Sequence, residues 1–422
     1  MEQTTFGPFR LDTTTTTLLR DGQELELRPQ AFHALKALIH NRGRYVGYAQ
    51  MINQAWDGNL VSKHTVAVTI GEVKKTLAEF GPWISYRPKL GYRLDVPHSD
   101  DLVKQGWHFW SRRTREGFEK ALDCFQQSAI ENPSDFRAFE GISLCYLLLG
   151  TYGMRMPREM YNGFLQAHNR AVELCGLTPE RRADRAHGLH LFEHRLQEAE
   201  AELLQAQEES PESPEVYVRL TMVYVTQGRL DDALNILLRA RSSHSLWPTV
   251  PANEILIRFF RREYEAAIAC GKRALELHPY LYLGRLFYGE ALEYGGHVSQ
   301  GLDQYRLAAI MSPDLPWLRA VEGACLARHG SRKEALSILA ELNQVRKTQY
   351  VDAYFTAALL DAVGDRDQAF RELERAFHER SAMLFALGVD PRLDSLRGDP
   401  RFAALLNRVF PHNKDAPQAV SA

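Results

Sequence analysis

Residues 61–94 read VSKHTVAVTIGEVKKTLAEFGPWISYRPKLGYRL, a helical pattern followed closely by a short β-prone hairpin. The apolar residues of the helical part recur at steps of three and four: Val66, Ile70, Val73 and Leu77. One face of this helix is therefore predicted to pack inward. The other face is predicted to hold His64, Thr65, Val68, Thr69, Glu72, Lys74 and Lys75. Cations, hydroxyls and a methyl-bearing side chain suit the reading of a major groove, so the stretch indicates a recognition helix and its wing.

The residues before this stretch predict the rest of a winged helix. Two β-prone runs on either side of Asp21-Gly22 form a strong hairpin signal. Helices are predicted over 30–40, directly after Pro29, and over 48–56. Three helices flanked by a sheet and closed by a hairpin give a winged helix that is predicted to bind duplex DNA.

Several short motifs in this region are shared with a known family. They are Leu27-Arg28-Pro29-Gln30-Ala31-Phe32, Gly43-Arg44-Tyr45-Val46, Ala55-Trp56, Val61-Ser62 with Thr65-Val66, and Pro88-Lys89-Leu90-Gly91-Tyr92-Arg93-Leu94. Together they resemble the OmpR/PhoB-type transcriptional regulatory winged helix over residues 6–96. By position, the resemblance implies base contacts from Val68, Glu72 and Lys74. It implies phosphate contacts from Trp56, His64, Thr65, Thr69 and Tyr92, and wing contacts from Arg87, Lys89 and Arg93.

The chain departs from the family at Gly71-Glu72, where the family commonly has two arginines. An arginine grips phosphate or reads guanine, whereas Glu72 only accepts hydrogen bonds, for example from cytosine N4, and Gly71 adds no charge. In the alternative interpretation Glu72 pairs with Lys63 or Lys75 on the helix surface. We expect Lys63, Lys74, Lys75 and the wing to supply more of the phosphate binding.

The rest of the chain follows a period of 34 residues. Small residues recur at that spacing: Ala199, Ala233, Ala267, Gly301, Ala335 and Ala369. Four of them have a glycine five residues earlier in the chain: Gly228, Gly296, Gly330 and Gly364. Small residues let two helices approach closely and glycine closes the turn before them, which is typical of tetratricopeptide (TPR) repeats. The predicted fold is mostly α: a winged helix-turn-helix (α+β) followed by an α/α TPR superhelix.

These patterns predict five segments. Residues 1–97 form the winged helix and 98–101 a short linker. Residues 102–381 form a solenoid of about eight helix pairs. Residues 382–410 are expected to cap the last pair, and 411–422 to be a disordered tail.

The composition agrees with a cytoplasmic protein. The chain has 51 Lys+Arg against 53 Asp+Glu, and its first 97 residues hold 12 and 9 of these, a mild positive excess that suits a DNA-binding head. The five cysteines form no C-x-x-C pair and are predicted to be reduced core residues. No window approaches the roughly 18 apolar residues of a membrane span.

The sequence offers few candidates for chemistry. It has no G-x-x-x-x-G-K-[ST], H-E-x-x-H or G-x-S-x-G motif, so neither an enzyme nor a cofactor is expected. His187, His190 and His194 share one face of a predicted helix. They are a candidate for zinc binding or pH sensing. The alternative is packing and hydrogen bonding between helices, because His187 and His190 fall on packing positions of the repeat.

The leading hypothesis is a cytoplasmic, sequence-specific transcription regulator. Its winged helix is expected to bind double-stranded DNA, and its TPR groove to receive RNA polymerase, another protein or peptide, or a second copy of the chain. No membrane partner is expected. The alternative is a TPR scaffold whose winged helix makes protein contacts, which the departure at Gly71-Glu72 leaves open.

Overall fold

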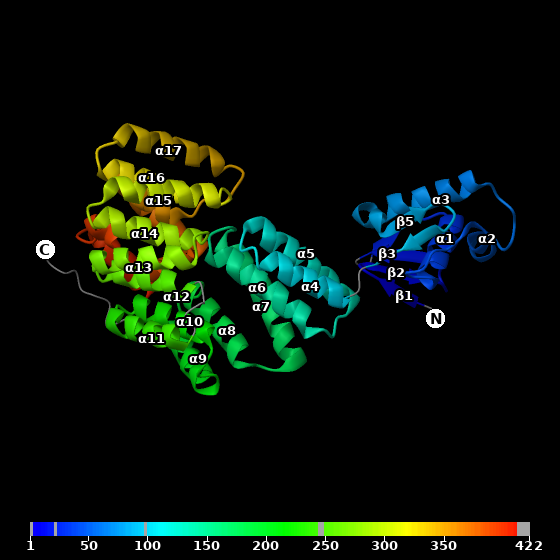
Figure 1. Cartoon of the computed structure of the whole chain (residues 1–422), viewed down its shortest axis with the longest axis horizontal. Coiled ribbons are helices and arrows are strands. Elements are labelled where there is room, and N and C mark those ends of the chain that lie inside the picture. Colours follow the sequence, from blue (N-terminus) through cyan, green and yellow to red (C-terminus); the bar gives the residue numbers. More distant parts are fainter. Residues whose placement is uncertain (1–2, 21–22, 97–98, 244–248, 412–422) are drawn as a thin grey trace. The chain divides into compact units, whose positions relative to one another are not determined.

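The computed structural model of the chain describes residues 3–20, 23–96, 99–243 and 249–411. The fold is mostly helical, as predicted. It divides into two compact units, which are described separately (Figure 1). Unit 1 comprises Met1–Ser111 and Lys120–Gly141, and unit 2 comprises Arg112–Glu119 and Ile142–Ala422. Among the described helices, none combines the length and the apolar character that crossing a bilayer requires.

A four-stranded antiparallel sheet opens unit 1. Its strands follow one another in chain order: β1 (Gln3–Phe6), β2 (Phe9–Asp12), β3 (Thr17–Arg20) and β4 (Gln23–Leu25). β3 pairs with β4, with Leu18 opposite Leu25, as the predicted hairpin requires. The Asp21-Gly22 turn of that hairpin lies outside the described residues.

Three helices and a wing complete the predicted winged helix. The helices are α1 (Pro29–His40), α2 (Tyr48–Ala55) and α3 (Lys63–Thr76). A short 3-10 helix, η1 (Ala78–Trp83), leads to the wing strands β5 (Ile84–Arg87) and β6 (Gly91–Leu94). Buried residues of the sheet and of all three helices form one hydrophobic core. This shared core fixes α3 relative to the sheet.

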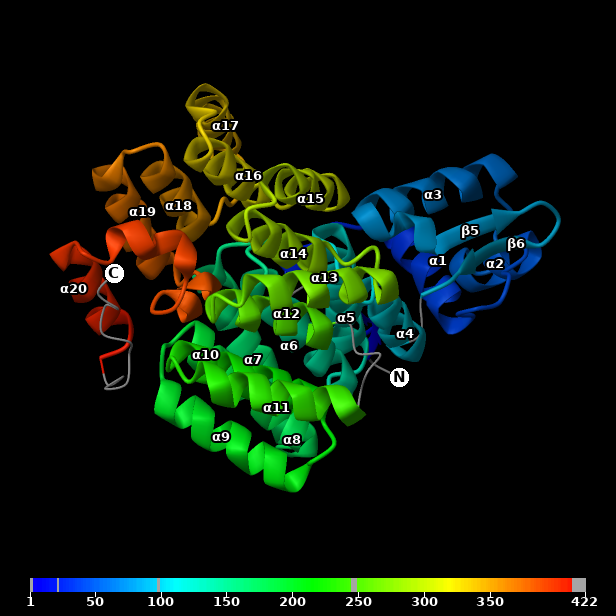
Figure 2. The ribbon, with the colours of Figure 1, turned by 60° about the vertical axis from the view of Figure 1, so that its left-hand side comes forward.

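Sixteen described helices, α4 to α19, follow the winged helix. Their bounds are α4 (Ser99–Trp110), α5 (Arg115–Glu131), α6 (Phe136–Thr151), α7 (Pro157–Cys175), α8 (Pro179–Leu191), α9 (Leu196–Glu209), α10 (Pro214–Thr226), α11 (Leu230–Ser243), α12 (Thr249–Phe260), α13 (Tyr264–Leu277), α14 (Tyr282–Tyr294), α15 (Val298–Met311), α16 (Trp317–Arg328), α17 (Arg332–Val345), α18 (Ala353–Ala362) and α19 (Arg366–Glu379). Residues 99–101, predicted as linker, are already helical because α4 begins at Ser99. Consecutive helices of unit 2 pack side by side, as α14 does with α15 (Figure 2).

The 34-residue period corresponds to one helix pair, which confirms the TPR prediction. The small residues at this spacing are fully buried where the second helix of a pair approaches the first: Ala199, Ala233, Ala267, Ala335 and Ala369. The glycines before them adopt left-handed backbone angles, with φ of 78° at Gly228 and 93° at Gly330. A Cβ would strain this conformation, so the turn favours glycine.

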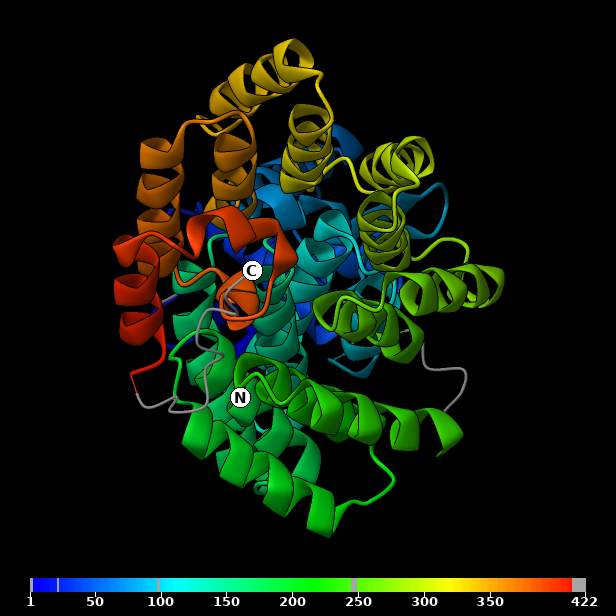
Figure 3. The ribbon, with the colours of Figure 1, turned by 90° about the vertical axis from the view of Figure 1, so that its left-hand side faces the viewer.

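The segment after α19 contacts helices from several pairs, whereas a terminal cap would cover only the last pair. Residues 382–397, here called the groove segment, contain η2 (Ala382–Ala386) and η3 (Pro391–Leu396). η2 contacts α8 and α10, and η3 contacts α18, whereas the following α20 (Pro400–Val409) packs against α19. Since α8, α10 and α18 are first helices of their pairs, the groove segment lies on the face of the solenoid that these first helices line, here called the concave face. Figure 3 shows the segment in orange-red.

Candidate nucleic-acid interface

Helix α3 starts at a side-chain cap and is anchored along one face. The Ser62 hydroxyl accepts a hydrogen bond from the Thr65 amide at 3.0 Å, which satisfies a free N–H group of the first turn. Val66, Ile70 and Val73 are at most 2% exposed. The opposite face of α3 therefore projects from a fixed position on the domain.

Most of the residues predicted to contact DNA lie at the surface of unit 1. The exposed ones are Lys63, His64, Thr65, Val68, Lys75, Arg87 and Lys89. The half-buried ones are Glu72, Lys74, Tyr92 and Arg93. All of them come from two elements, α3 and the wing.

Two predicted contact residues are buried instead. Thr69 is 5% exposed, and its hydroxyl donates a hydrogen bond to the Thr65 carbonyl at 3.0 Å. The prediction that Thr69 faces outward was wrong, because it lies three residues after Val66 and so falls on the inner stripe. Trp56 is 8% exposed and belongs to the hydrophobic core. Neither side chain offers its bulk to a ligand.

Glu72 has a partner that the sequence did not indicate. Arg28, directly before α1, donates from its Nε to a Glu72 carboxylate oxygen at 2.7 Å and from its backbone amide to the other at 3.3 Å. The alternative interpretation of the sequence had paired Glu72 with Lys63 or Lys75. Hydrogen bonds from Arg28 hold the pKa of Glu72 below its usual value. The carboxylate is thus engaged within unit 1, where it links α3 to the start of α1.

Tyr45 supports the arginines of the wing, a role that the sequence did not reveal. Its ring centre lies 4.7 Å from the Arg93 guanidinium and 5.8 Å from that of Arg87. Arg93 also donates from its Nε to Asp95 at 2.8 Å. The sequence indicated only that Tyr45 belongs to a motif of the family. Its contact with the wing joins residues that are more than 40 positions apart, so no local pattern could reveal it.

The three histidines of the second candidate site make separate contacts in unit 2. His187 shares a hydrogen bond with the Thr151 hydroxyl at 3.2 Å, and His190 shares one with Thr226 at 2.7 Å. His194 lies against the rings of Phe377 and Phe410, 6.2 and 5.7 Å between ring centres. Burial is the main cause that lowers the pKa of His190 to about 3 and that of His194 to about 4. This arrangement favours neutral rings that pack between helices.

We expect a His194→Phe variant to resist mild acid better than the parent chain. The depressed pKa means that the unfolded state takes up a proton below its ordinary value of 6.5, so stability is lost as pH falls below that value. Phenylalanine keeps the ring packing and does not titrate. The free energy of unfolding should rise by about 1 kcal/mol relative to the parent at pH 5.5, and little at pH 8. Replacing the exposed His297 by Gln is the control, and an equal gain at both pH values would contradict the interpretation.

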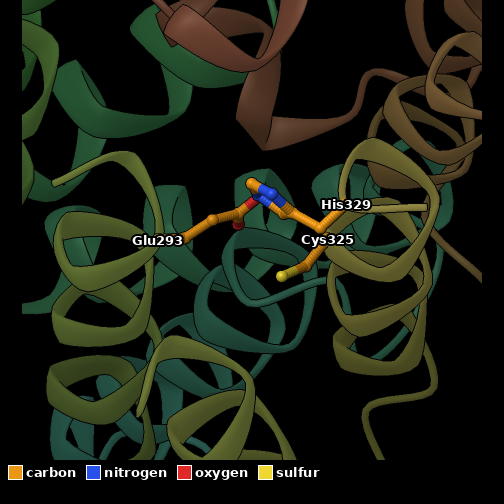
Figure 4. A group of neighbouring side chains, drawn as sticks. All are labelled: Glu293, Cys325 and His329. Atoms are coloured by element: carbon orange, nitrogen blue, oxygen red, sulfur yellow. The ribbon is translucent and has the colours of Figure 1, made fainter. Parts of the chain in front are cut away.

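Among the described residues, one further cluster has the composition of a metal site. Glu293, Cys325 and His329 place their ligand atoms within 4.8 Å of one another (Figure 4). The Glu293 carboxylate, however, accepts hydrogen bonds from Arg328 at 2.9 and 3.1 Å and from the Tyr305 hydroxyl at 2.8 Å. Burial and then Glu293 raise the pKa of Cys325 to about 12, so its thiol keeps its proton. The donor chemistry fits a buried ion pair better than a metal centre.

Comparisons with known proteins agree with both parts of the fold. Residues 22–94 match the family described as transcriptional regulatory protein, C terminal, and residues 191–246 match a tetratricopeptide repeat family. The chain is 34% identical over 86 residues to the transcriptional regulatory protein CutR of Streptomyces coelicolor, which covers 20% of this chain and 39% of CutR. It is 32% identical over 82 residues to the transcriptional activator CadC of Escherichia coli, covering 18% of this chain and 16% of CadC.

A solved structure shares the fold of the longer part. The human IFIT1 dimer with m7Gppp-AAAA is similar over 78% of this chain and 80% of that chain, with a TM-score of 0.52 and 14% identity. This likeness shows the fold alone. The similarity to CutR and CadC is confined to less than half of either relative. The chain therefore carries an OmpR/PhoB-type transcriptional regulatory domain at its N-terminal end, followed by tetratricopeptide repeats.

Proposed function

We propose that the chain is a sequence-specific DNA-binding transcription regulator whose solenoid binds a protein or peptide partner. The observation that carries the proposal is the set of exposed cations on α3 and the wing, within a domain of the transcriptional regulatory family. α3 enters the major groove, where Val68 and Lys74 meet base edges. Lys63, Lys75 and the wing residues Arg87 and Lys89 contact phosphates, which fixes the register but reads no sequence.

In this proposal Glu72 has a structural role and does not make the base contact that the family resemblance implies. Its carboxylate is held by Arg28, so it positions α3 against α1 and does not read a base. His64, Thr65, Tyr92 and Arg93 lie at the edge of the same surface and add contacts to the DNA backbone. RNA polymerase and a second copy of the chain are candidate partners of the solenoid, and the cytoplasm is the proposed compartment.

The experiment that tests DNA binding replaces one cation on each element. A Lys75→Ala, Lys89→Ala variant of the full chain is expected to bind a selected promoter fragment more weakly and to reduce the slope of log K against log salt by about one to two. The matched control is Lys272→Ala with Lys333→Ala, two exposed lysines of unit 2. A fluorescence titration between low and moderate salt measures both slopes, and equal slopes would remove these contacts from the interface.

A protein scaffold is the second candidate, and one observation favours it. Gly71 is exposed and a Cβ at this position would meet nothing within 4 Å, so the middle of the outer face of α3 carries no side chain. With Glu72 neutralised by Arg28, this part of α3 offers DNA little attraction. Absence of any duplex binding by the full chain at low salt would favour the scaffold.

A further inference from the structure

One arginine of the groove segment occupies a defined pocket on the concave face of unit 2. Arg392 is almost fully buried and forms ion pairs with Glu290 of α14 at 2.5 Å and with Asp390 of its own segment at 2.6 Å. Its guanidinium carbon lies 5.9 Å from the ring centre of Tyr354 and 5.2 Å from that of Phe355, both on α18. A carboxylate from α14 and two aromatic rings from α18 thus form a pocket suited to a planar guanidinium.

The neighbouring side chains of the segment extend this recognition along the groove. Phe385 lies against His190 of α8 and Phe260 of α12, with 6.4 and 6.3 Å between ring centres. At the partly exposed rim, Asp394 forms an ion pair with Arg262 at 2.7 Å. Through Phe385 and Arg392 the segment thus contacts α8, α12, α14 and α18.

The groove segment is irregular backbone that is stabilised by its own hydrogen bonds. It contains only short 3-10 turns and keeps its own shape, since Arg397 donates to the carbonyls of Gly388 at 2.8 Å and Asp390 at 3.0 Å. Its C-terminal end is also held outside the groove, because α20 packs on α19 and Arg408 pairs with Glu374 there. Neighbouring helix pairs also contact one another directly, as α13 does with α14, so their stacking does not depend on the segment alone.

The arginine pocket also contains an acceptor that the segment leaves unused. One oxygen of Glu290, Oε2, is buried and has no hydrogen-bond partner among the described residues. A buried polar atom without a partner is costly. A ligand that presents one more donor at this point would satisfy the atom.

We propose that the concave face is a peptide-binding groove, in which Glu290, Tyr354 and Phe355 receive the arginine of an Asp-x-Arg-Leu segment from a partner protein. The groove segment, with Asp390, Arg392 and Leu393 in that pattern, is the internal competitor of this partner. The inference rests on the proposed role of the solenoid in binding a partner. It does not depend on whether unit 1 binds DNA.

The test uses the full chain and a fluorescent peptide with the sequence of residues 388–398. An Arg392→Met variant weakens the internal competitor, so we expect it to bind this peptide at least about tenfold more tightly than the parent does. Asp394→Ala removes the ion pairs of this carboxylate with Arg262 and Arg397, which loosens the segment at its rim, and a smaller gain is expected. Arg401→Met, a matched change on α20, should bind like the parent. A second peptide with methionine in place of the arginine should gain nothing from either groove variant.

Each other outcome has a defined meaning. If Arg392→Met fails to fold by circular dichroism, Asp394→Ala carries the test. If no folded groove variant gains affinity, the segment is a fixed part of the solenoid and the proposal is wrong. Equal binding of both peptides would overturn the arginine pocket. A mobility-shift assay with the same preparations reports DNA binding separately, so loss of one proposal leaves the other standing.

Discussion

A Gly91→Ala variant is expected to lose about 3 kcal/mol of stability in the winged helix, through steric overlap and backbone strain together. Gly91 begins β6 with φ of 103°, a conformation that L-residues rarely adopt. A Cβ there would overlap the carbonyl oxygen of Val46. Val46 is also hydrogen-bonded to Tyr92, the residue after Gly91. Its amide donates to the Tyr92 carbonyl at 2.7 Å, and its carbonyl accepts from the Tyr92 amide at 3.1 Å. The added methyl group would therefore push the wing away from the core.

Gly43→Ala is the matched control for this prediction. Gly43 has φ of 76°, but a Cβ at Gly43 would meet nothing within 4 Å, so only backbone strain of about 1 kcal/mol is expected. Denaturant unfolding followed by a probe in unit 1 measures both variants, and DNA binding reports the position of the wing. Equal losses in the two variants would show that contact between Gly91 and Val46 does not restrict the wing.

The helices and repeats could be predicted from the sequence because their signals are local. Val66, Ile70 and Val73 repeat at the helical period, and the buried alanines from Ala199 to Ala369 repeat at 34 residues. Thr69 was misplaced because its hydroxyl is a polar signal, although the position is on the inner stripe. The structure resolves this conflict with a hydrogen bond from Thr69 to the backbone of its own helix, which lets a polar residue be buried.

The contacts that define the candidate sites could not be predicted, because they join residues far apart in the chain. Arg28 and Glu72 are 44 residues apart, and Arg392 and Glu290 are 102 apart. The spacing of 44 residues matches no repeat period. The spacing of 102 equals three repeats, but Arg392 lies after α19, outside the helix pairs that keep the period. The groove segment has turn residues and no periodicity, so its sequence indicated a terminal cap and gave no sign that it returns to the concave face.

An Arg392→Met variant is expected to lose about 3–5 kcal/mol of stability at pH 8, because it leaves two carboxylates buried without their cation. Both Glu290 and Asp390 are fully buried. Burial already raises the pKa of Glu290 to about 7 against the attraction of Arg392. Arg392 is also the main influence that holds the pKa of Asp390 below its usual value against burial. Without the guanidinium, both carboxyl groups should titrate at higher pH in the folded chain.

Because the uncompensated groups are carboxyl groups, the loss of stability depends on pH in a definite direction. A carboxyl group whose folded pKa lies above its unfolded value keeps its full contribution at low pH and loses stability as pH rises through the folded pKa. Arg392→Met should therefore be closest to the parent near pH 5 and furthest from it near pH 8. Adding Glu290→Gln removes one buried charge and should restore part of the loss at pH 8 only, whereas Arg401→Met, at an exposed ion pair, should change little. Thermal unfolding of the parent and the three variants at both pH values measures these differences. If the loss is independent of pH and is unaffected by Glu290→Gln, packing of the arginine side chain, and not its charge, holds the groove segment in place.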